Sequence, residues 1–280
     1  MPSPTASPAR RPLAAVTGAS SGIGACFAEV LAARGMDLII IARRGDRLEA
    51  LATKVRDDSG ADARILVADL TDPEALRTVE ISLAEAEIDL LINCAGFGTY
   101  DAFHKIDPER IKRELMLDLI APAALSRAVI PGMLARGQGD ILNVCSMAGF
   151  IPIPRHATYC AAKAGLIRLT EVLHGELAGT GVRVSGVCPG PVPTEFFAIS
   201  GYRIEDVPPY LMQSVADCVE LALKARDRSQ VLSIPHRFVR AFVAVLRLLP
   251  LSLRVKILGG GPAWLNGPEG KRVKVAGGPG

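Results

Sequence analysis

The sequence predicts an α/β fold, built as a doubly wound parallel sheet with helices on both faces and a helical extension at the carboxyl end. Short apolar runs alternate with helical patterns along most of the chain, the first run leads into a glycine-rich turn, and polar residues follow the later runs. Strands that alternate with helices of this length form βαβ units, whose sheets are parallel and covered on both faces.

A single domain is expected over residues 13–234. Its strands are predicted from short runs of β-branched and other apolar residues at 13–16, 37–41, 64–68, 89–93, 140–145, 182–188 and 230–234. Its helices are predicted after the glycine-rich turn to about residue 34, from residue 72 onward, and at 46–57, 108–135, 158–178 and 214–225. We expect residues 1–12 to be a disordered lead, 235–265 an amphipathic helical extension, and 266–280 a disordered tail rich in Gly and Pro.

The composition indicates a mostly aliphatic core and no nucleic-acid partner. The chain has 280 residues, of which 49% are hydrophobic and only 5% aromatic, and its net charge is +3. A charge this small does not indicate nucleic-acid binding. The six cysteines are scattered without a CxxC pair or metal-ligand spacing, and residues 1–12 lack the apolar run of a secretory signal. Both features predict a cytoplasmic protein whose cysteines stay reduced.

A tyrosine and a lysine, Tyr159 and Lys163, stand four residues apart in a segment that reads as helix. On a helix they share one face, so the ammonium can lie near the phenol, favour phenolate and lower the pKa of Tyr159 toward working pH. A tyrosine tuned in this way can give a proton to a carbonyl oxygen or take one from an alcohol. The same spacing occurs on many helices by chance, so its meaning depends on the rest of the chain.

The first strand-to-helix turn carries Gly18, Gly22 and Gly24. Glycine tolerates such a turn and lets the backbone approach a pyrophosphate, which then meets the free N–H groups of the helix N-terminus. The spacing is Gly-x-x-x-Gly-x-Gly, and an ordinary tight turn is the alternative. The pattern predicts a dinucleotide site in a sheet of the Rossmann type.

The end of the second strand bears on the choice of dinucleotide. Ala42 is followed there by Arg43 and Arg44, where an NAD site would place a carboxylate for the ribose hydroxyls, whereas arginine accommodates a 2′-phosphate. This favours NADP(H); a solvated pair of charges opening a helix is the alternative. Asp69 and Leu70 follow the third strand, where a carboxylate can accept a hydrogen bond from an adenine amino group.

Together these motifs resemble the short-chain dehydrogenase/reductase family. They occur in the family's order and at its spacings over residues 13–234: Thr17-Gly18-Ala19-Ser20-Ser21-Gly22-Ile23-Gly24, Asp69-Leu70, Asn93-Cys94-Ala95-Gly96, Ser146, Tyr159-x-x-x-Lys163 and Pro189-Gly190-Pro191-Val192-Pro193-Thr194. The resemblance implies an oxidoreductase that transfers hydride between NADP(H) and a ketone, an aldehyde or a secondary alcohol. No metal is needed, because tyrosine and serine polarise the carbonyl.

The resemblance also implies a role for each matching residue. Tyr159 would be the acid/base, Lys163 would lower its pKa and hold the nicotinamide ribose, and Ser146 would orient the carbonyl. Thr194 would hold the nicotinamide carboxamide. The residues expected to bind the cofactor are Gly18, Ser20, Ser21, Gly22, Ile23, Gly24, Arg43, Arg44, Asp69, Leu70, Asn93, Ala95, Gly96, Tyr159, Lys163, Pro189, Val192 and Thr194.

Two positions depart from the family pattern. Cys94 replaces a second asparagine in the usual Asn-Asn-Ala-Gly, and it is small enough to keep the turn. Asp118 stands where family members carry an asparagine that is thought to kink the helix and hold a water leading from the lysine to solvent. A carboxylate accepts hydrogen bonds but cannot donate them. We therefore include Asp118 in the catalytic set and leave its relay role open.

The segment 195–213 resembles the family's mobile substrate loop. It carries Phe196, Phe197, Ile199 and Tyr202, which favours an apolar carbonyl substrate. The alternative is that these side chains only close the loop against the sheet.

The tail 236–258 has no acidic residue, and Arg240, Arg247 and Arg254 repeat every seven positions. The pattern predicts an amphipathic helix on an anionic membrane surface, or helices packed on the substrate pocket or on a partner subunit. It does not predict a spanning helix, because Pro250 interrupts a short apolar run.

Two other functions remain open from the sequence. One is a non-catalytic NADP(H)-binding sensor or scaffold at a membrane, suggested by Asp118 and the tail, and the other is a ketoacyl-thioester reductase. The intact Ser146, Tyr159 and Lys163 oppose the first. No clear basic patch for an acidic carrier protein supports the second. The family commonly forms homodimers or homotetramers, so a homo-oligomer is expected.

Overall fold

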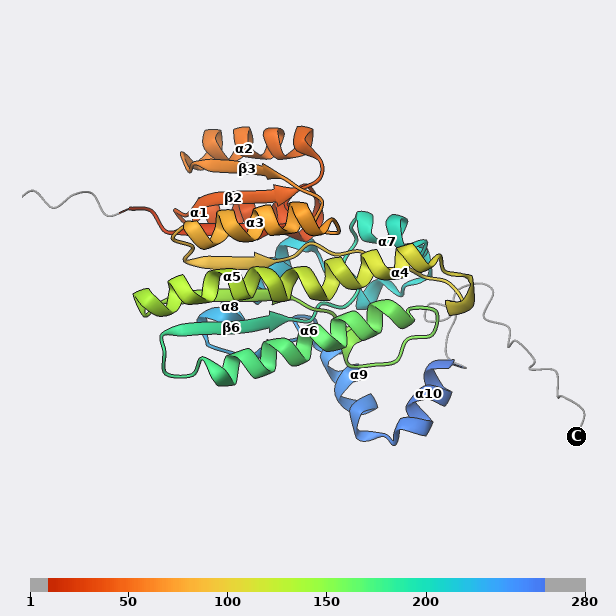
Figure 1. Ribbon diagram of the computed structural model, residues 1–280. Coiled ribbons are helices and arrows are strands. Elements are labelled where there is room, and N and C mark those ends of the chain that lie inside the picture. Colours follow the sequence, from red (N-terminus) through yellow and green to blue (C-terminus); the bar gives the residue numbers. More distant parts are fainter. Residues whose placement is uncertain (1–9, 260–280) are drawn as a thin grey trace, which may run out of the picture.

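The computed structural model describes residues 10–259 and contains one sheet of seven parallel strands (Figure 1). The spatial order of the strands is β3-β2-β1-β4-β5-β6-β7. This confirms the predicted doubly wound sheet, with boundaries that differ from the predicted ones by one or two residues. The strands are β1 (Leu13–Thr17), β2 (Asp37–Ala42), β3 (Ala63–Val67), β4 (Leu90–Asn93), β5 (Gly139–Val144), β6 (Val182–Val187) and β7 (Leu232–Ser233).

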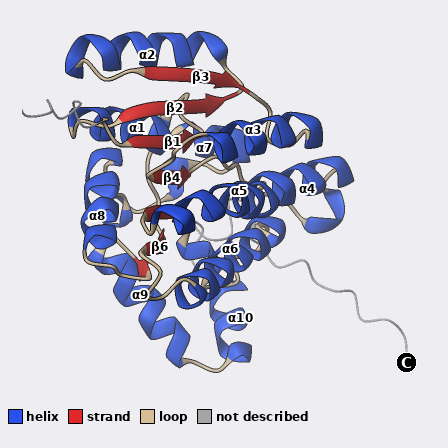
Figure 2. Ribbon diagram, turned by 60° about the vertical axis from the view of Figure 1, so that its left-hand side comes forward, coloured by secondary structure: helices blue, strands red, loops and turns tan. Residues whose placement is uncertain are grey.

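Helices cover both faces of the sheet (Figure 2). One face packs against α1 (Gly22–Ala33), α2 (Gly45–Ser59) and α8 (Val215–Asp227). The other face packs against α3 (Pro73–Glu85), α5 (Ala121–Arg136) and α6 (Ala157–Glu176), with α4 (Pro108–Leu115) leading into α5. This three-layer arrangement is what βαβ units produce when their crossover helices cover both sides of the sheet.

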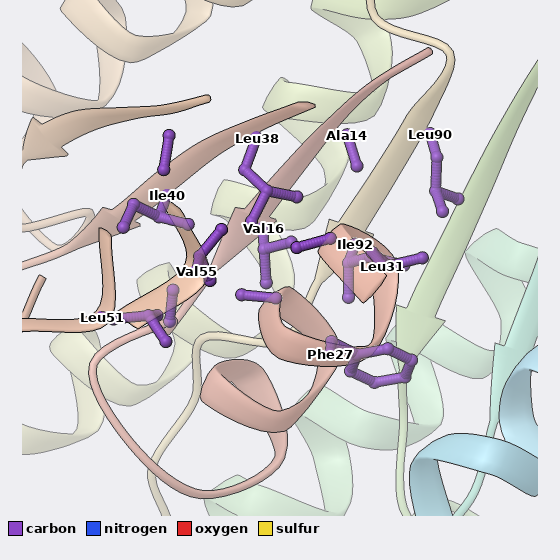
Figure 3. Close-up of a cluster of buried hydrophobic side chains, with 14 of the residues drawn as sticks. Ala14, Val16, Phe27, Leu31, Leu38, Ile40, Leu51, Val55, Leu90 and Ile92 are labelled. Atoms are coloured by element: carbon purple, nitrogen blue, oxygen red, sulfur yellow. The ribbon is translucent and has the colours of Figure 1, made fainter. Parts of the chain in front are cut away.

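The core is aliphatic and follows the alternation of side chains along each strand. Val16, Leu38 and Ile40 lie together on the α1 side of the sheet (Figure 3). Ile39 and Ile41, from the same strand as Leu38, pack on the opposite side. Successive side chains of a strand point to opposite faces, so a strand that is buried on both faces reads as a continuous apolar run.

The order of the strands reverses between β1 and β4, and a hydrogen-bonded link joins the ends of these two strands. The hydroxyl of Thr17 accepts from the N–H groups of Cys94 and Ala95, at 2.9 and 3.0 Å. Ligands of open α/β sheets bind outside the carboxyl ends of the strands at such a reversal. Thr17 therefore helps to shape the floor of a candidate binding site.

The helix predicted at 108–135 is continuous but changes its winding part-way. A π-helical segment, Met116–Ile120, separates α4 from α5 and contains the fully buried Asp118. By length and composition alone, Pro108–Arg136 could cross a membrane, a test that the core helices of soluble proteins also pass. Its packing beside α3 and α6 makes it a layer of this fold. Segments of π-helix often occur at functional sites.

The predicted helical extension is present as two helices after β7 (Figure 1). They are α9 (Arg237–Leu248) and α10 (Leu251–Gly259). The inner face of α9 packs on the segment that follows β6, which contains α7 (Glu195–Ser200) and two 3₁₀ turns. One prediction for this tail is that its helices pack on the substrate pocket. The inner face of α9 packs on segment 195–213, which the sequence predicts to be the substrate loop.

The amino-terminal end corrects one expectation. The sequence predicts a disordered lead that includes Arg10 and Arg11, but the Arg10 guanidinium pairs with Asp89 at 2.8 Å and Arg11 donates to the carbonyl of Gly60 at 2.9 Å. These contacts hold residues 10–12 against the start of the sheet. The expectations for residues 1–9, 260–265 and 266–280 lie outside the described part of the chain.

Candidate active site

A cavity of about 390 Å³ opens at the carboxyl ends of the strands, where the strand order reverses. It is lined by the first turn of α1, the ends of β2 to β5, the start of α6 and the segment after β6. All of the site residues that the sequence predicts line this cavity except one, Asn93. Residues from widely separated parts of the chain thus meet in a single site.

The glycine-rich turn forms a cradle that side chains would fill. Gly18 has φ +70°, and a Cβ there would lie 2.8 Å from the Cα of Ala95. A Cβ on Gly24 would collide with the carbonyl oxygen of Gly18, and Gly22 has φ +57°. At Gly24 only glycine fits, because a Cβ would collide with the backbone. At Gly18 glycine is required both by such a collision and by the positive φ. The resulting bare backbone before α1 fits a pyrophosphate group.

Arginines from the β2–α2 turn lie beside this cradle. The Arg44 guanidinium donates to the hydroxyls of Ser20, at 2.9 Å, and Ser21, at 2.7 Å. It also pairs with the carboxylate of Glu195 at 2.7 Å, and Arg47 binds the other oxygen of the same carboxylate. Hydrogen bonds from Arg47 and Arg44 lower the pKa of Glu195 to about 2, so this carboxylate is ionised at neutral pH. Arg43 lies 3.7 Å from the carboxylate of Asp69.

A buried ion pair lies at the centre of the site. The Lys163 ammonium is 3.0 Å from a carboxylate oxygen of Asp118 and donates to the carbonyl of Val144, also at 3.0 Å. The second oxygen of Asp118 accepts from the N–H of Phe97 at 3.1 Å. Both side chains are buried, so the pair is held in place rather than shared with solvent. The Lys163 Nζ is 5.7 Å from the centroid of the Tyr159 ring.

The charge state of Tyr159 differs from the sequence expectation. Burial raises the pKa of Tyr159 to about 12, although Lys163 and a hydrogen bond with Ser146 oppose this change. The carboxylate of Asp118 adds to the rise, because it offsets the charge of Lys163. Burial lowers the pKa of Lys163, but Asp118, Tyr159 and Cys145 together outweigh burial and hold that pKa above its ordinary value. The protein alone therefore holds Tyr159 as a neutral phenol, and the predicted lowering of its pKa is wrong for this state.

Ser146 lies at the end of β5, where it begins a 3₁₀ turn. Its hydroxyl accepts from the N–H of Ala148 at 3.1 Å, which fixes the side chain at the cavity wall. The hydroxyl can still donate its own proton to an oxygen in the cavity. Ser146 and Tyr159 thus supply two O–H donors to the same region.

Asn93 corrects the predicted set of cofactor residues. Its amide donates to the side-chain oxygen of Asn143 at 2.8 Å, and the Asn143 amide donates to Thr170 at 2.9 Å. All three side chains are buried below the cavity. Asn93 therefore ties β4 to β5 and α6 instead of lining the cavity.

Several residues that line the cavity were missed by reasoning from the sequence. His156 is buried next to Tyr159, with 6.0 Å between the ring centroids, and burial lowers its pKa to about 4. Arg113 enters the cavity from α4, and Glu195 reaches it from α7. The sequence does contain a signal for Arg113. On a helix, Arg113 lies one turn before Leu117, and Leu117 directly precedes the predicted site residue Asp118.

Comparison with known proteins identifies the family. A family model described as short chain dehydrogenase matches residues 12–201, which include the glycine turn, Ser146 and the Tyr159–Lys163 pair. The chain belongs to the short-chain dehydrogenase family.

Two solved structures match most of this chain. One, from Sphingobium yanoikuyae in complex with NADPH, is 39% identical with a TM-score of 0.79, and the match covers 84% of this chain and 92% of that one. The other, the bulky-bulky ketone specific alcohol dehydrogenase from Comamonas testosteroni, is 34% identical with a TM-score of 0.73 over 85% and 93% of the chains.

A longer relative is the very-long-chain 3-oxoacyl-CoA reductase of Bos taurus. It is 32% identical over 190 residues, which are 66% of this chain and 61% of that protein. This short-chain dehydrogenase thus spans less than two thirds of the length of the bovine protein.

Proposed function

We propose that this short-chain dehydrogenase is an NADP(H)-dependent reductase of apolar ketones or aldehydes, which also oxidises the corresponding alcohols. The observation that carries the proposal is one cavity that holds both the bare glycine turn with its arginines and the cluster of Ser146, Tyr159 and Lys163. An oxidoreductase needs these two halves side by side, so that a bound carbonyl meets the cofactor and a proton donor together.

The cofactor half fits NADP(H). The glycine turn before α1 would hold the pyrophosphate, and Arg44 would face the 2′-phosphate with Ser20 and Ser21 beside it. Asp69 would accept from the adenine amino group. The bound nicotinamide supplies the hydride and accepts it in the reverse direction. The relative from Sphingobium yanoikuyae, solved with NADPH, supports this choice over NAD(H).

The protein supplies position and protons. Tyr159 gives its phenolic proton to the carbonyl oxygen, and Ser146 donates a hydrogen bond to the same oxygen. The raised pKa keeps Tyr159 protonated at neutral pH, which suits the reductive direction. Lys163, held by Asp118 and the carbonyl of Val144, then stabilises the phenolate that remains.

The substrate half is apolar. Ile153, Phe196, Phe197, Tyr202 and Val207 line the cavity on the side of the segment after β6. Apolar walls with two O–H donors fit a ketone or aldehyde with hydrocarbon substituents. The relative specific for bulky-bulky ketones supports a large apolar substrate.

A second candidate is a 3-oxoacyl-thioester reductase, because the bovine relative acts on such a substrate. It uses the same chemistry on a carbonyl within an acyl chain. A non-catalytic sensor is disfavoured by the complete set of Ser146, Tyr159 and Lys163 around one cavity.

The first experiment combines binding and turnover. NADPH and NADH are titrated by fluorescence, and cofactor oxidation is then followed with a panel of bulky aliphatic and aromatic ketones, aldehydes and 3-oxoacyl thioesters. We expect tighter binding of NADPH, turnover of ketones, and a loss of turnover in Tyr159→Phe by a factor on the order of 10² to 10⁴ with binding kept. Binding without turnover of any carbonyl contradicts the reductase and leaves the sensor. Preference for NADH contradicts the role of Arg44.

We also propose a cytoplasmic homodimer or homotetramer. All six cysteines are free, as expected in a reducing compartment. The outer surfaces of α5 and α6 expose Leu134 and Val172, and Ile120 is exposed where α5 begins. Light scattering after gel filtration tests the assembly, and a monomer at micromolar concentration contradicts it.

A further inference from the structure

The carboxyl-terminal helices carry an unusual concentration of exposed apolar side chains. Seven of the sixteen large apolar side chains that are exposed in the described chain belong to α9 and α10: Phe238, Val245, Leu248, Leu251, Leu253, Val255 and Ile257. We call these seven the hairpin surface. Leu248 is 86% exposed and Leu251 is 61% exposed, and they flank Pro250 at the turn between the two helices. A concentration of exposed apolar side chains on one pair of helices marks a candidate interaction site.

The hairpin surface is not the apolar face that α9 uses to fold. Val239, Val243 and Leu246 form that inner face, and they pack into a cluster with Phe197 and other residues of the segment after β6. Phe238, Val245 and Leu248 lie outside this contact. The apolar residues of α9 therefore serve two surfaces, one toward the protein and one away from it.

The charged residues of the two helices that carry the hairpin surface are all positive. Arg237, Arg240, Arg247, Arg254 and Lys256 belong to the two helices, and no acidic residue occurs between residues 235 and 259. Within the part of the chain that the structure describes, none of these five cations forms an ion pair with a carboxylate. Arg237 lies over the Phe238 ring at 4.6 Å, which keeps a cation next to an exposed apolar group.

We propose that the hairpin surface docks on an anionic lipid bilayer, with Leu248 and Leu251 entering the boundary between headgroups and acyl chains. Exposed apolar groups mixed with unpaired cations complement an anionic membrane surface. A second copy of this chain fits less well, because a two-fold contact would bring the same five cations against each other. The two helices also project from the body below α6 in both views, so the turn between them can reach a flat surface (Figures 1 and 2).

Docking would bring the substrate cavity close to the lipid. Phe197 and Val207 line the cavity and also pack on the inner face of α9. The cavity wall is therefore in direct contact with the helix that carries part of the hairpin surface. The docking uses none of the catalytic residues, so a test of membrane binding does not depend on the proposed reaction.

Vesicle flotation of the full-length protein tests the proposal. Vesicles of phosphatidylcholine alone are compared with vesicles that also contain phosphatidylglycerol. We expect flotation only with the anionic vesicles, and weaker flotation as salt is raised, because salt screens the cations. Leu248→Glu should lower the bound fraction about tenfold or more, since it places a charge where a leucine would enter the lipid. Arg240→Glu should also weaken binding.

The matched control is Ile81→Glu on α3, where an exposed apolar side chain lies on another surface. It likewise replaces an exposed aliphatic side chain by a carboxylate, and it should float like wild type. Thermal melting of each variant reports folding. Absence of flotation with both vesicle types overturns the proposal, as does equal flotation of wild type and Leu248→Glu. Conversion of an oligomer to a monomer by Leu248→Glu, without vesicle binding by wild type, assigns the surface to a second copy instead.

Discussion

At the scale of single residues, Asp118 decides the electrostatics around Tyr159. Its carboxylate lies 3.0 Å from the Lys163 ammonium, and both side chains are buried. An isolated lysine would pull the pKa of the tyrosine down strongly, whereas a paired lysine does so much less. The pKa of about 12 for Tyr159 reflects burial first and this pairing as well.

Replacing Asp118 by asparagine should therefore lower the pKa of Tyr159. The introduced amide carries no charge, so Lys163 would act on the phenol without an opposing carboxylate, and the amide oxygen could still accept from the N–H of Phe97. Alcohol oxidation requires phenolate, and its rate rises as pH approaches the tyrosine pKa. We expect the rising limb of the pH–rate profile for oxidation to move to lower pH in Asp118→Asn. Steady-state rates measured between neutral and alkaline pH, with Tyr159→Phe as the inactive reference, check this; an unchanged or upward-shifted limb contradicts it.

Glu195 is the second residue with a testable electrostatic role. Its carboxylate holds Arg44 and Arg47, and Arg44 is the side chain that we propose for the 2′-phosphate. The carboxylate and the phosphate would compete for the same guanidinium. In Glu195→Gln we expect roughly two- to fivefold tighter NADPH binding, the range that an exposed ion pair supports, with NADH binding unchanged.

Fluorescence titration of both nucleotides measures this change. Glu220→Gln is the control, because it removes a carboxylate on α8 that pairs with Arg34, the residue after α1. Neither residue lines the cavity. Equal tightening of NADPH and NADH would mean that Glu195 acts on the fold of the loop rather than on the phosphate.

At the scale of elements, the turn between β1 and α1 is specified by contact as well as by backbone conformation. Gly18 and Gly35 both have positive φ, at +70° and +84°. A Cβ on Gly18 would meet the backbone of Ala95, whereas a Cβ on Gly35 would meet nothing within 4 Å. Comparing alanine substitutions at the two glycines therefore separates the free-energy cost of a positive φ from the free-energy cost of a collision.

Gly35→Ala should lower the free energy of unfolding by about 1 kcal/mol, the cost of a positive φ alone. Gly18→Ala should lower it further, by a total of about 2 to 4 kcal/mol, because the turn must also move away from Ala95. It should also weaken NADPH binding, which Gly35→Ala should leave unchanged. Urea denaturation followed by circular dichroism gives the two energies, and equal losses would show that the contact with Ala95 relaxes freely.

At the scale of the whole molecule, the cofactor should bind across both halves of the sheet. The cavity takes its walls from the end of β2 and the segment after β1 on one side of the strand reversal, and from the end of β5 and the segment after β4 on the other. A ligand that binds only the folded state stabilises it by mass action. At a concentration about one hundred times its dissociation constant, NADPH should stabilise the protein by about 2.7 kcal/mol.

A thermal shift measurement checks this prediction. NADPH should raise the melting temperature more than the same concentration of NADH, and Arg44→Ala should remove most of the difference between them. Arg34→Ala, which removes an exposed arginine outside the cavity, is the matched control. Equal shifts for the two nucleotides in wild type contradict the proposed preference.

Much of this molecule could be predicted from the sequence because its signals are local. Runs such as Leu38–Ile41 indicate buried strands, and the glycine turn and the Tyr159–Lys163 spacing each lie within one turn or one helix. The order in which these signals follow one another then predicts the sheet, the family and most of the residues that line the cavity. Each of these inferences needs only the neighbours of a residue along the chain.

Only the tertiary structure decided the properties that depend on neighbours distant in sequence. Asn93 turns to Asn143 and away from the cavity, Glu195 reaches Arg44 across 151 positions, and burial with Asp118 raises the pKa of Tyr159. The same holds for the tail, where packing uses one apolar face of α9 and leaves another exposed. Residue type and spacing determine what a side chain can do, whereas burial and its partners in space determine which of these it does.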